Sequence, residues 1–449
     1  MTIQTQWTQL LAGAYRCNIT PPIGMPIEGS FHLIRADEIL DELYASALVL
    51  DDGQNEIALV SVDACQIQEQ LHAQIGAEIT KLTGIPRARQ MVVSTHTHNG
   101  PTVGGVVVED KDVWWDYVEH FKRQIASAVF MAQKRKQPAR VGAATGANPR
   151  HVFNRRLRHP DGDIIMNWFN KGLLKECVPA GPVDPALGVI KVARPDGTPL
   201  AFVVSYALHN NAASGAPHHT AISADFSGAM SDALRRTYAS DVITLFLPGA
   251  MGDINWINYA DPTQDYNIIY QQIGNSLAAT VMQLDQDMAY EMQPRLQMHQ
   301  RLLKIAERPW EDAWLWDYRV FQLETPRNTS PSNPFYQAHL LWLEAGSPPL
   351  PTHELDMRVL AIGDNIAIAS NPSEFFVELG MQVKAASPFQ HTLMSTLTNG
   401  NAGYVPTRQA FVDGGYEVKK YPAGSFLAIE AGEQMVEASI RLLREAKSK

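Results

Sequence analysis

The 449-residue sequence has only three cysteines, a shortage of positive charge and no long apolar run. The cysteines, Cys17, Cys65 and Cys177, are odd in number and far apart, which excludes a disulfide framework and a four-cysteine zinc knot. No run reaches the roughly eighteen apolar residues that a membrane helix needs, so we expect no stable membrane insertion. Residues 1–6 lack the basic start and apolar core of a signal peptide. Together these absences favour a reduced, cytoplasmic protein.

Basic residues are outnumbered by acidic ones. Lys and Arg total 37 and Asp and Glu total 47, which gives a formal net charge of −10 and a pI near 5.8. A protein that binds nucleic acid through its phosphates needs a basic face, and the basic clusters at residues 134–136 and 155–156 are short. We therefore expect a small-molecule substrate and no nucleic-acid partner. The sequence leaves open whether the chain forms homo-oligomers.

The apolar residues, 45% of the chain, are enough for a large core and fall into periodic segments. Residues 44–50 and 56–62 are expected to be strands around the turn Asp51-Asp52-Gly53. Residues 70–82 have helical spacing, and an apolar strand follows at 90–94. Further strands are predicted at 201–206 and 242–247, and further helices at 113–135, 228–238, 268–284 and 424–445.

Strands and helices alternate through most of the chain, which predicts an α/β fold with a mixed β-sheet core layered with helices. No linker rich in Gly, Ser or Pro separates two halves, so we expect a single domain over residues 1–449 with an insertion at about 300–350. In that insertion Trp310 and Trp314 are four positions apart, as on one packed helical face. A wall that binds a sugar-like or aromatic substrate is the alternative.

The most informative stretch is S-T-H-T-H-N-G-P at residues 94–101. Alternate side chains of an extended chain share a face, so His96 and His98 are expected to project together. Two imidazoles at this spacing can hold one cation, or one can bind it while the other transfers a proton. Two histidines with purely structural hydrogen bonds are the competing interpretation.

Other catalytic motifs are missing from the sequence. Asn-Gly-Pro after His98 departs from a metallo-β-lactamase pattern, and several elements precede the His-x-His, unlike in an amidohydrolase barrel. The sequence has no H-E-x-x-H helix, no glycine-rich phosphate loop and no G-x-S-x-G elbow. Serine hydrolases and nucleotide-binding enzymes therefore rank below a metal-dependent enzyme.

Several segments, in order along the whole chain, resemble the neutral, non-lysosomal ceramidases and their shorter bacterial relatives. These segments are residues 13–22, 60–63, 94–101, 207–211 with 222–225, 246–253, 371–374 and 403–407. One departure is Asn99, where the family usually has Ser. The resemblance implies the α/β catalytic domain of that family and a zinc-dependent hydrolase.

The resemblance also implies a ligand set for one zinc ion. Carried over by motif, the ligands are His96, His209, Glu374 and Tyr404. Imidazole nitrogens and hard oxygens suit zinc, and a bound cation makes a phenolate accessible at neutral pH. The competing interpretation of Glu374 is a carboxylate in the first turn of a helix. With these ligands in place, His98 becomes the residue that transfers a proton.

Three more residues are implied near the substrate carbonyl: Arg155, Arg156 and Tyr416. A guanidinium there would stabilise developing negative charge or bind a substrate carboxylate, and the tyrosine would donate to the oxyanion. The sequence leaves open which arginine faces the site. The competing interpretations are a pair of surface arginines and a packed aromatic side chain.

The expected reaction is hydrolysis of an amide C–N bond in a small polar or N-acylated substrate by a zinc-activated water. The long ceramidases carry a further C-terminal β-sandwich domain and are usually secreted or membrane-associated. This sequence shows neither that domain nor an export signal, which points away from a membrane lipid. Two alternatives stay open: a zinc-dependent esterase, lactonase or other hydrolase of a sugar-like molecule, and a non-catalytic ligand-binding relative.

Overall fold

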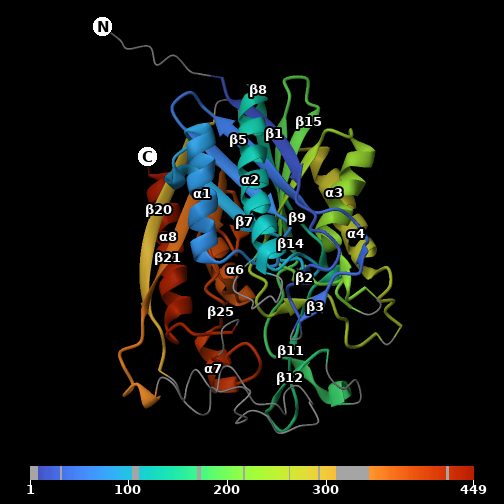
Figure 1. The fold of residues 1–449 in the computed structure, drawn as a ribbon, viewed down its shortest axis with the longest axis vertical. Coiled ribbons are helices and arrows are strands. Elements are labelled where there is room, and N and C mark those ends of the chain that lie inside the picture. Colours follow the sequence, from blue (N-terminus) through green and yellow to red (C-terminus); the bar gives the residue numbers. More distant parts are fainter. Residues whose placement is uncertain are drawn as a thin grey trace.

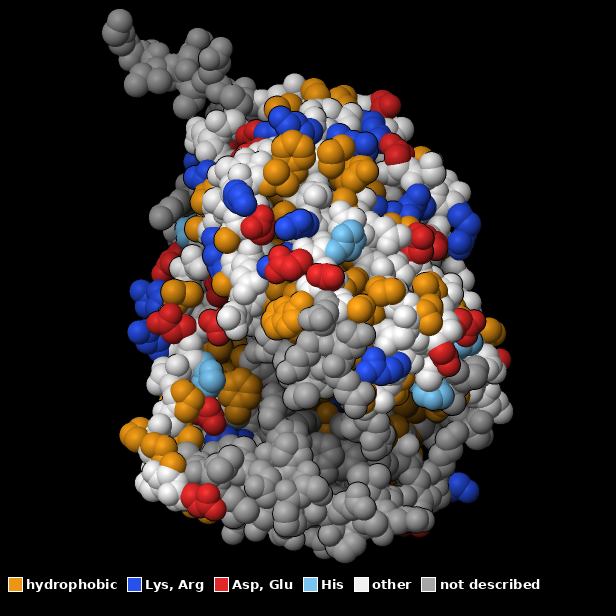
Figure 2. All heavy atoms as spheres, in the orientation of Figure 1, with side chains coloured by type: hydrophobic (Ala, Val, Ile, Leu, Met, Phe, Trp, Pro, Cys, Tyr) orange, Lys and Arg blue, Asp and Glu red, His pale blue; other side chains and the backbone are white. Residues whose placement is uncertain are grey.

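The computed structural model describes most of the chain. The described residues are 9–30, 33–103, 111–168, 173–215, 218–261, 263–291, 294–309, 343–420 and 424–448. Over this part the fold is mixed α/β, with three sheets of four or five strands and helices on their outer faces (Figure 1). No helix among these residues is long and apolar enough to cross a membrane. Acidic and basic side chains are interspersed on the face drawn in Figure 2.

The first sheet is covered by two helices that lie across its strands in Figure 1. Its strands are β1 (Leu11–Asn18), β5 (Tyr44–Asp51), β6 (Glu56–Val62), β7 (Gln90–Ser94) and β8 (Gln137–Pro138), and its helices are α1 (Glu69–Thr83) and α2 (Lys111–Lys134). The strand order is β7-β6-β5-β1-β8. β5 and β6 form an antiparallel hairpin, and β7 lies parallel to β6. The site residues that follow β6 and β7 therefore leave the sheet at the same edge.

The second and third sheets follow the same plan of strands with a helix pair. The second sheet contains β9 (Arg140–Ala147), β14 (Ala186–Ala193), β15 (Pro199–Tyr206), β17 (Ile243–Pro248) and β19 (Tyr290–Glu291), and its helices are α3 (Asp225–Thr237) and α4 (Ile269–Asp285). Its strand order is β17-β15-β14-β9-β19. The third, in the order β20-β21-β22-β24, contains β20 (Leu296–Ala306), β21 (Thr352–Ile362), β22 (Ile366–Ser370) and β24 (His391–Ser395), with α6 (Val377–Ala385) and α8 (Ala431–Lys447).

Short elements carry several of the site residues. They are β2 (Pro26–Ile27), β3 (Ile34–Arg35), β4 (Glu38–Ile39), β10 (Phe153–Asn154), β11 (Arg156–Arg158), β12 (Ile164–Met166), β13 (Val178–Pro179), β16 (Ala221–Ile222), β18 (Ile254–Asn255), β23 (Glu374–Phe375), β25 (Tyr404–Val405), α7 (Arg408–Asp413) and the 3-10 turns Arg87–Arg89, Pro149–His151 and Leu173–Glu176.

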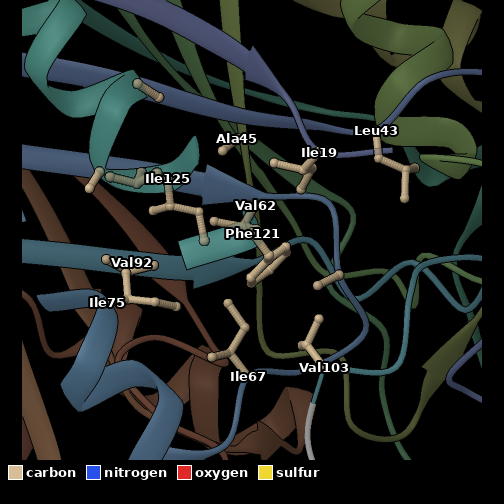
Figure 3. Close-up of a cluster of buried hydrophobic side chains, with 14 of the residues drawn as sticks. Ile19, Leu43, Ala45, Val62, Ile67, Ile75, Val92, Val103, Phe121 and Ile125 are labelled. Atoms are coloured by element: carbon tan, nitrogen blue, oxygen red, sulfur yellow. The ribbon is translucent and has the colours of Figure 1, made fainter. Parts of the chain in front are cut away.

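One central core lies between the three sheets, and separate cores lie under the helix pairs. The alternation of strand side chains divides them: Leu48 and Leu50 of β5 face the central core, whereas Ala47 and Val49 face the helices. Phe121 of α2 and Ile75 of α1 belong to the core between the first sheet and its helices (Figure 3). The sheets thus hold one another face to face.

The structure confirms the expected fold class and most of the expected elements, with two exceptions. The helix expected at 424–445 begins only at Ala431, because residues before it bond to another segment: Arg308 N donates to the Phe426 carbonyl and Ala428 N to the Ala306 carbonyl. The first residues of the expected insertion belong to β20. Trp310 and Trp314 lie outside the described residues.

Candidate metal centre

Loops at the ends of strands bring three histidines and a glutamate together. His96 follows β7, His209 follows β15, and Glu374 lies on β23. Glu374 Oε2 is 3.4 Å from His96 Nε2 and 3.2 Å from His209 Nε2. His98 Nε2 is 3.2 Å from His96 Nε2. His96, His209 and Glu374 are buried, with side chains exposed by 5%, 0% and 7%.

Each imidazole is oriented by a backbone carbonyl. His96 Nδ1 is 2.8 Å from the Cys65 carbonyl oxygen and His209 Nδ1 is 2.8 Å from that of Met251. His98 Nδ1 is 2.9 Å from the carbonyl oxygen of Gly29. A carbonyl only accepts, so each Nδ1 carries a hydrogen, and each ring turns its Nε2 toward the centre. Such outer hydrogen bonds are typical of histidines that bind a metal.

The charges at the centre also suit a cation. Burial, and after it the neighbouring Arg155 guanidinium, lower the pKa of His209 to about 4. Burial and the other two histidines hold the pKa of His98 well below its ordinary value. Burial acts to raise the pKa of Glu374, but His96 and His209 outweigh it and hold that pKa well below its usual range. The centre therefore offers neutral imidazoles at His98 and His209 and an ionised carboxylate at Glu374.

The backbone around His96 is not the extended strand that the sequence analysis assumed. His96 has a φ of 65°, in the left-handed region that is uncommon for non-glycine residues and often marks a functional site. His96 N donates to the Ala64 carbonyl and His98 N to that of Asn210, and these bonds fix the turn. The expectation that the two rings lie together is met, but its basis in strand geometry was wrong.

Tyr404 is placed beside the glutamate by a short parallel pair of strands. In the register of β23 and β25, Glu374 pairs with Tyr404, so the two side chains leave the strands next to each other. Tyr404 is buried, and burial raises the pKa of its phenol well above the ordinary value. A phenolate at this position would need a bound cation close by.

The two candidate arginines have different surroundings. Arg155 Nη1 is 3.1 Å from His209 Nε2, whereas Arg156 Nη2 donates to the Gly414 carbonyl at 2.6 Å. Both donate to Glu417, Arg155 through Nε at 2.8 Å and Arg156 through Nη1 at 2.6 Å. Arg155 thus faces the histidines, and Arg156 holds the loop after α7. Tyr416 is buried, with its ring centroid 5.7 Å from that of Tyr404 and 5.7 Å from the Arg155 guanidinium carbon.

Sequence reasoning missed several residues that support the centre. Glu417 forms ion pairs with both arginines. The only signal for it in the sequence was its position next to Tyr416. A Cβ on Gly252 would lie 2.4 Å from the Glu374 carbonyl oxygen, so only glycine lets the two loops approach. Gly29 has a φ of 104°, and a Cβ there would lie 2.5 Å from the His98 ring.

Two groups of donors among the described residues are close enough to hold a metal ion. One is His96, His209 and Glu374, and the other is Cys65, His96 and His98; the ligand atoms of each group lie within 4.8 Å of one another. Burial raises the pKa of the Cys65 thiol well above its ordinary value, which disfavours the thiolate that a metal binds. The first group already holds a carboxylate whose Oε2 is buried without a hydrogen-bond donor.

No family model and no curated protein matches the sequence, but solved structures match the fold. A crystal structure of the neutral ceramidase from Pseudomonas aeruginosa superposes with a TM-score of 0.69 and 18% identity, covering 98% of this chain and 74% of that one. A ceramidase complexed with C2 gives a TM-score of 0.71 and 17% identity, covering 98% and 75%. The chain has a neutral ceramidase-like fold. This finding confirms the fold that the sequence motifs implied.

The buried Glu417 predicts a pH-dependent stability. Glu417→Gln leaves two buried guanidinium groups without their counter-charge, which we expect to cost about 3–5 kcal/mol of unfolding free energy at pH 7. The two arginines lower the pKa of Glu417 in the fold against the effect of burial. Its contribution is therefore present above the unfolded pKa of about 4.3 and is lost as the pH falls through the folded pKa.

Urea unfolding midpoints of the wild type and the variant between pH 3 and 7 measure this effect. The difference in unfolding midpoint between wild type and Glu417→Gln should be largest near neutral pH and should decrease below pH about 4. Glu437→Gln, at an exposed position of α8, is the matched control and should change little at any pH. A midpoint difference that does not change with pH would contradict the role of Glu417 as the counter-charge of the two arginines.

Proposed function

We propose that this protein is a zinc-dependent hydrolase that cleaves an amide C–N bond of a small polar or N-acylated substrate. The observation that carries the proposal is the convergence of imidazole Nε2 atoms on the buried carboxylate of Glu374, at 3.2 and 3.4 Å. Donors about 2.0–2.1 Å from a tetrahedral zinc ion lie about 3.3 Å from one another, so this spacing suits zinc. The fold shared with two ceramidase structures supports hydrolysis of an amide.

In this proposal His96, His209, Glu374 and Tyr404 hold the ion. When bound, zinc supplies a water of lowered pKa and polarises the substrate carbonyl. The backbone carbonyls of Cys65 and Met251 fix the imidazole rings of His96 and His209 with each Nε2 near the Glu374 carboxylate, and Arg155, 3.1 Å from His209 Nε2, would release that nitrogen to the ion. Tyr404 completes the set from the strand paired with Glu374.

The remaining site residues would act on protons and on developing charge. His98, neutral and with its Nδ1 fixed by Gly29, can accept a proton at Nε2 and return it to the leaving amine. Arg155, held by Glu417, would donate to the oxyanion together with Tyr416, in a buried setting where such bonds are strong. Arg156 would position the Tyr416 loop through Gly414 and Glu417.

The first test of this proposal is the zinc content. The purified protein should carry about one zinc ion per chain, and His96→Ala and His209→Ala should each lose most of it, because three donors of a four-ligand site bind zinc weakly. Elemental analysis of dialysed protein measures this. His120→Ala, at an exposed position of α2, is the matched control and should keep its zinc. Full zinc in both site variants would rule out this centre.

The second test separates His98 from the ligands. If His98 transfers a proton, His98→Ala should keep its zinc while kcat falls by on the order of 10²–10⁴. Zinc content and turnover are measured on the same preparation. A loss of zinc as large as that in His96→Ala would instead assign His98 as a ligand.

The third test concerns the substrate. We expect short polar N-acyl amides to be hydrolysed with a higher kcat/KM than ceramides, because the buried Arg155–Glu417 ion pair lies beside His209 and suits a polar substrate. If the site instead had an apolar channel, each methylene of a bound acyl chain would add about 0.8 kcal/mol to the binding free energy. Competition assays should pair each amide with its ester, since the same residues could act on both. A kcat/KM that climbs steadily with acyl length would identify a lipid amidase instead.

A further inference from the structure

The inner face of the first sheet changes from apolar to polar at one end of its strands. Leu48 of β5 and Leu59 of β6 face the central core. Two positions along, on the same face, are Ser46 and Ser61, which pair with each other in the β5–β6 register, and Arg16 of β1 pairs with Ser46. A row of polar side chains thus continues a face that is otherwise apolar. Ser61 Oγ donates to the Phe246 carbonyl at 2.7 Å, and Arg16, Ser46 and Ser61 all line a cavity.

A cavity of about 260 Å³ lies in front of this row. Thr244 of β17 and Ser227 and Ser231 of α3 also line it. Asp41 and Asp63 also line it. The exposed side chains of Glu42 and Asp232 line it too, so the cavity opens to solvent there. The volume is several times the share of about 30 Å³ that one water takes in the liquid, enough for a small organic molecule.

A buried hydroxyl group in the wall has no partner among the described residues. Thr244 is 7% exposed, and its Oγ1 is without a hydrogen bond. Its neighbours Ile243 and Leu245 face the central core, so the alternation of β17 directs Thr244 away from that core, toward α3 and the cavity. A buried hydroxyl left unpaired is costly, and a ligand in the cavity would supply its partner.

The charges of the cavity select a cation. The carboxylates of Asp41, Glu42, Asp63 and Asp232 outnumber the guanidinium of Arg16, whose central carbon lies 3.7 Å from the Tyr44 ring centroid. Burial raises the pKa of Asp41 to about 6 and that of Asp63 to about 7, so their charge is unfavourable without a counter-ion. Asp41 already accepts from Ala224 N at one oxygen and from the Ser223 hydroxyl at the other, and Asp63 accepts from Tyr44 N.

The spacing of these groups favours an organic cation over a metal ion. A metal needs several donors around one point, and the two three-residue groups of that kind among the described residues both include His96, in the metal centre. Among the described residues, the carboxylates of the cavity form no such group of three. An alkyl diammonium ion carries N–H donors at both ends of a carbon chain and can donate to two carboxylates that do not share one point.

We propose that this cavity binds a small organic ammonium ion, such as an aliphatic diamine, between Asp41, Asp63 and the Thr244 hydroxyl. The site is separate from the metal centre, although Thr95 lines it and the next residue is His96. The proposal does not rest on the hydrolytic activity, because it needs neither zinc nor a substrate.

Isothermal titration of the full-length protein with putrescine, with and without prior removal of metal, tests the proposal. We expect one site per chain in both states. Asp63→Asn keeps an acceptor for Tyr44 N but removes the charge, and should weaken binding about 10- to 100-fold, as expected for loss of a charged hydrogen bond. Thr244→Val keeps the side-chain volume and charge and should weaken binding about 3- to 10-fold.

The matched control is Asp116→Asn, an exposed position on α2, which covers the other face of the sheet; it should bind like the wild type. Thermal unfolding of each variant checks its fold, and Thr244→Val tests the cavity even if Asp63→Asn is unstable. Parallel titrations use calcium chloride and the uncharged 1,4-butanediol. The absence of putrescine binding, binding unchanged in both cavity variants, or tighter binding of calcium or the diol would each overturn the proposal.

Discussion

The candidate metal centre depends on three hydrogen bonds between imidazole Nδ1 atoms and backbone carbonyls. The carbonyls belong to Cys65, Met251 and Gly29, which lie in loops that follow β6, β17 and β2. A carbonyl cannot rotate away as a side chain can, so the folded backbone itself fixes the ring orientation and the tautomer. Because the three loops come from different parts of the fold, the centre exists only when the first and second sheets are packed together.

A second constraint is the balance of buried charge around that centre. Arg155 beside His209 would repel a metal cation if its charge were not offset, and Glu417 offsets it while also holding Arg156. The same carboxylate therefore links the residue that faces the histidines to the loop that carries Tyr416. The two buried carboxylates have different partners. Glu374 lies beside His209, where it would bind the cation, whereas Glu417 pairs with the guanidinium groups.

Local sequence patterns predicted most of the helices and strands and part of the site. The bounds of β6 and β7 were predicted because the hairpin turn and the apolar runs are local signals. The start of α8 was missed because residues 425–428 bond to a segment more than a hundred residues earlier. In the site, His96 and His98 were found from their spacing, yet the left-handed turn at His96 is set by bonds to distant loops. Glu417 was missed since its partner Arg155 is 262 positions away.

The measurement that tests the central claim most directly is X-ray absorption at the zinc edge of the zinc-loaded protein. His96 belongs to both candidate donor groups, one with His209 and Glu374 and one with Cys65 and His98. The account predicts about four nitrogen or oxygen scatterers at about 2.0–2.1 Å, with imidazole multiple scattering and no sulfur. A sulfur scatterer at about 2.3 Å would show that Cys65 holds the ion and would contradict the account.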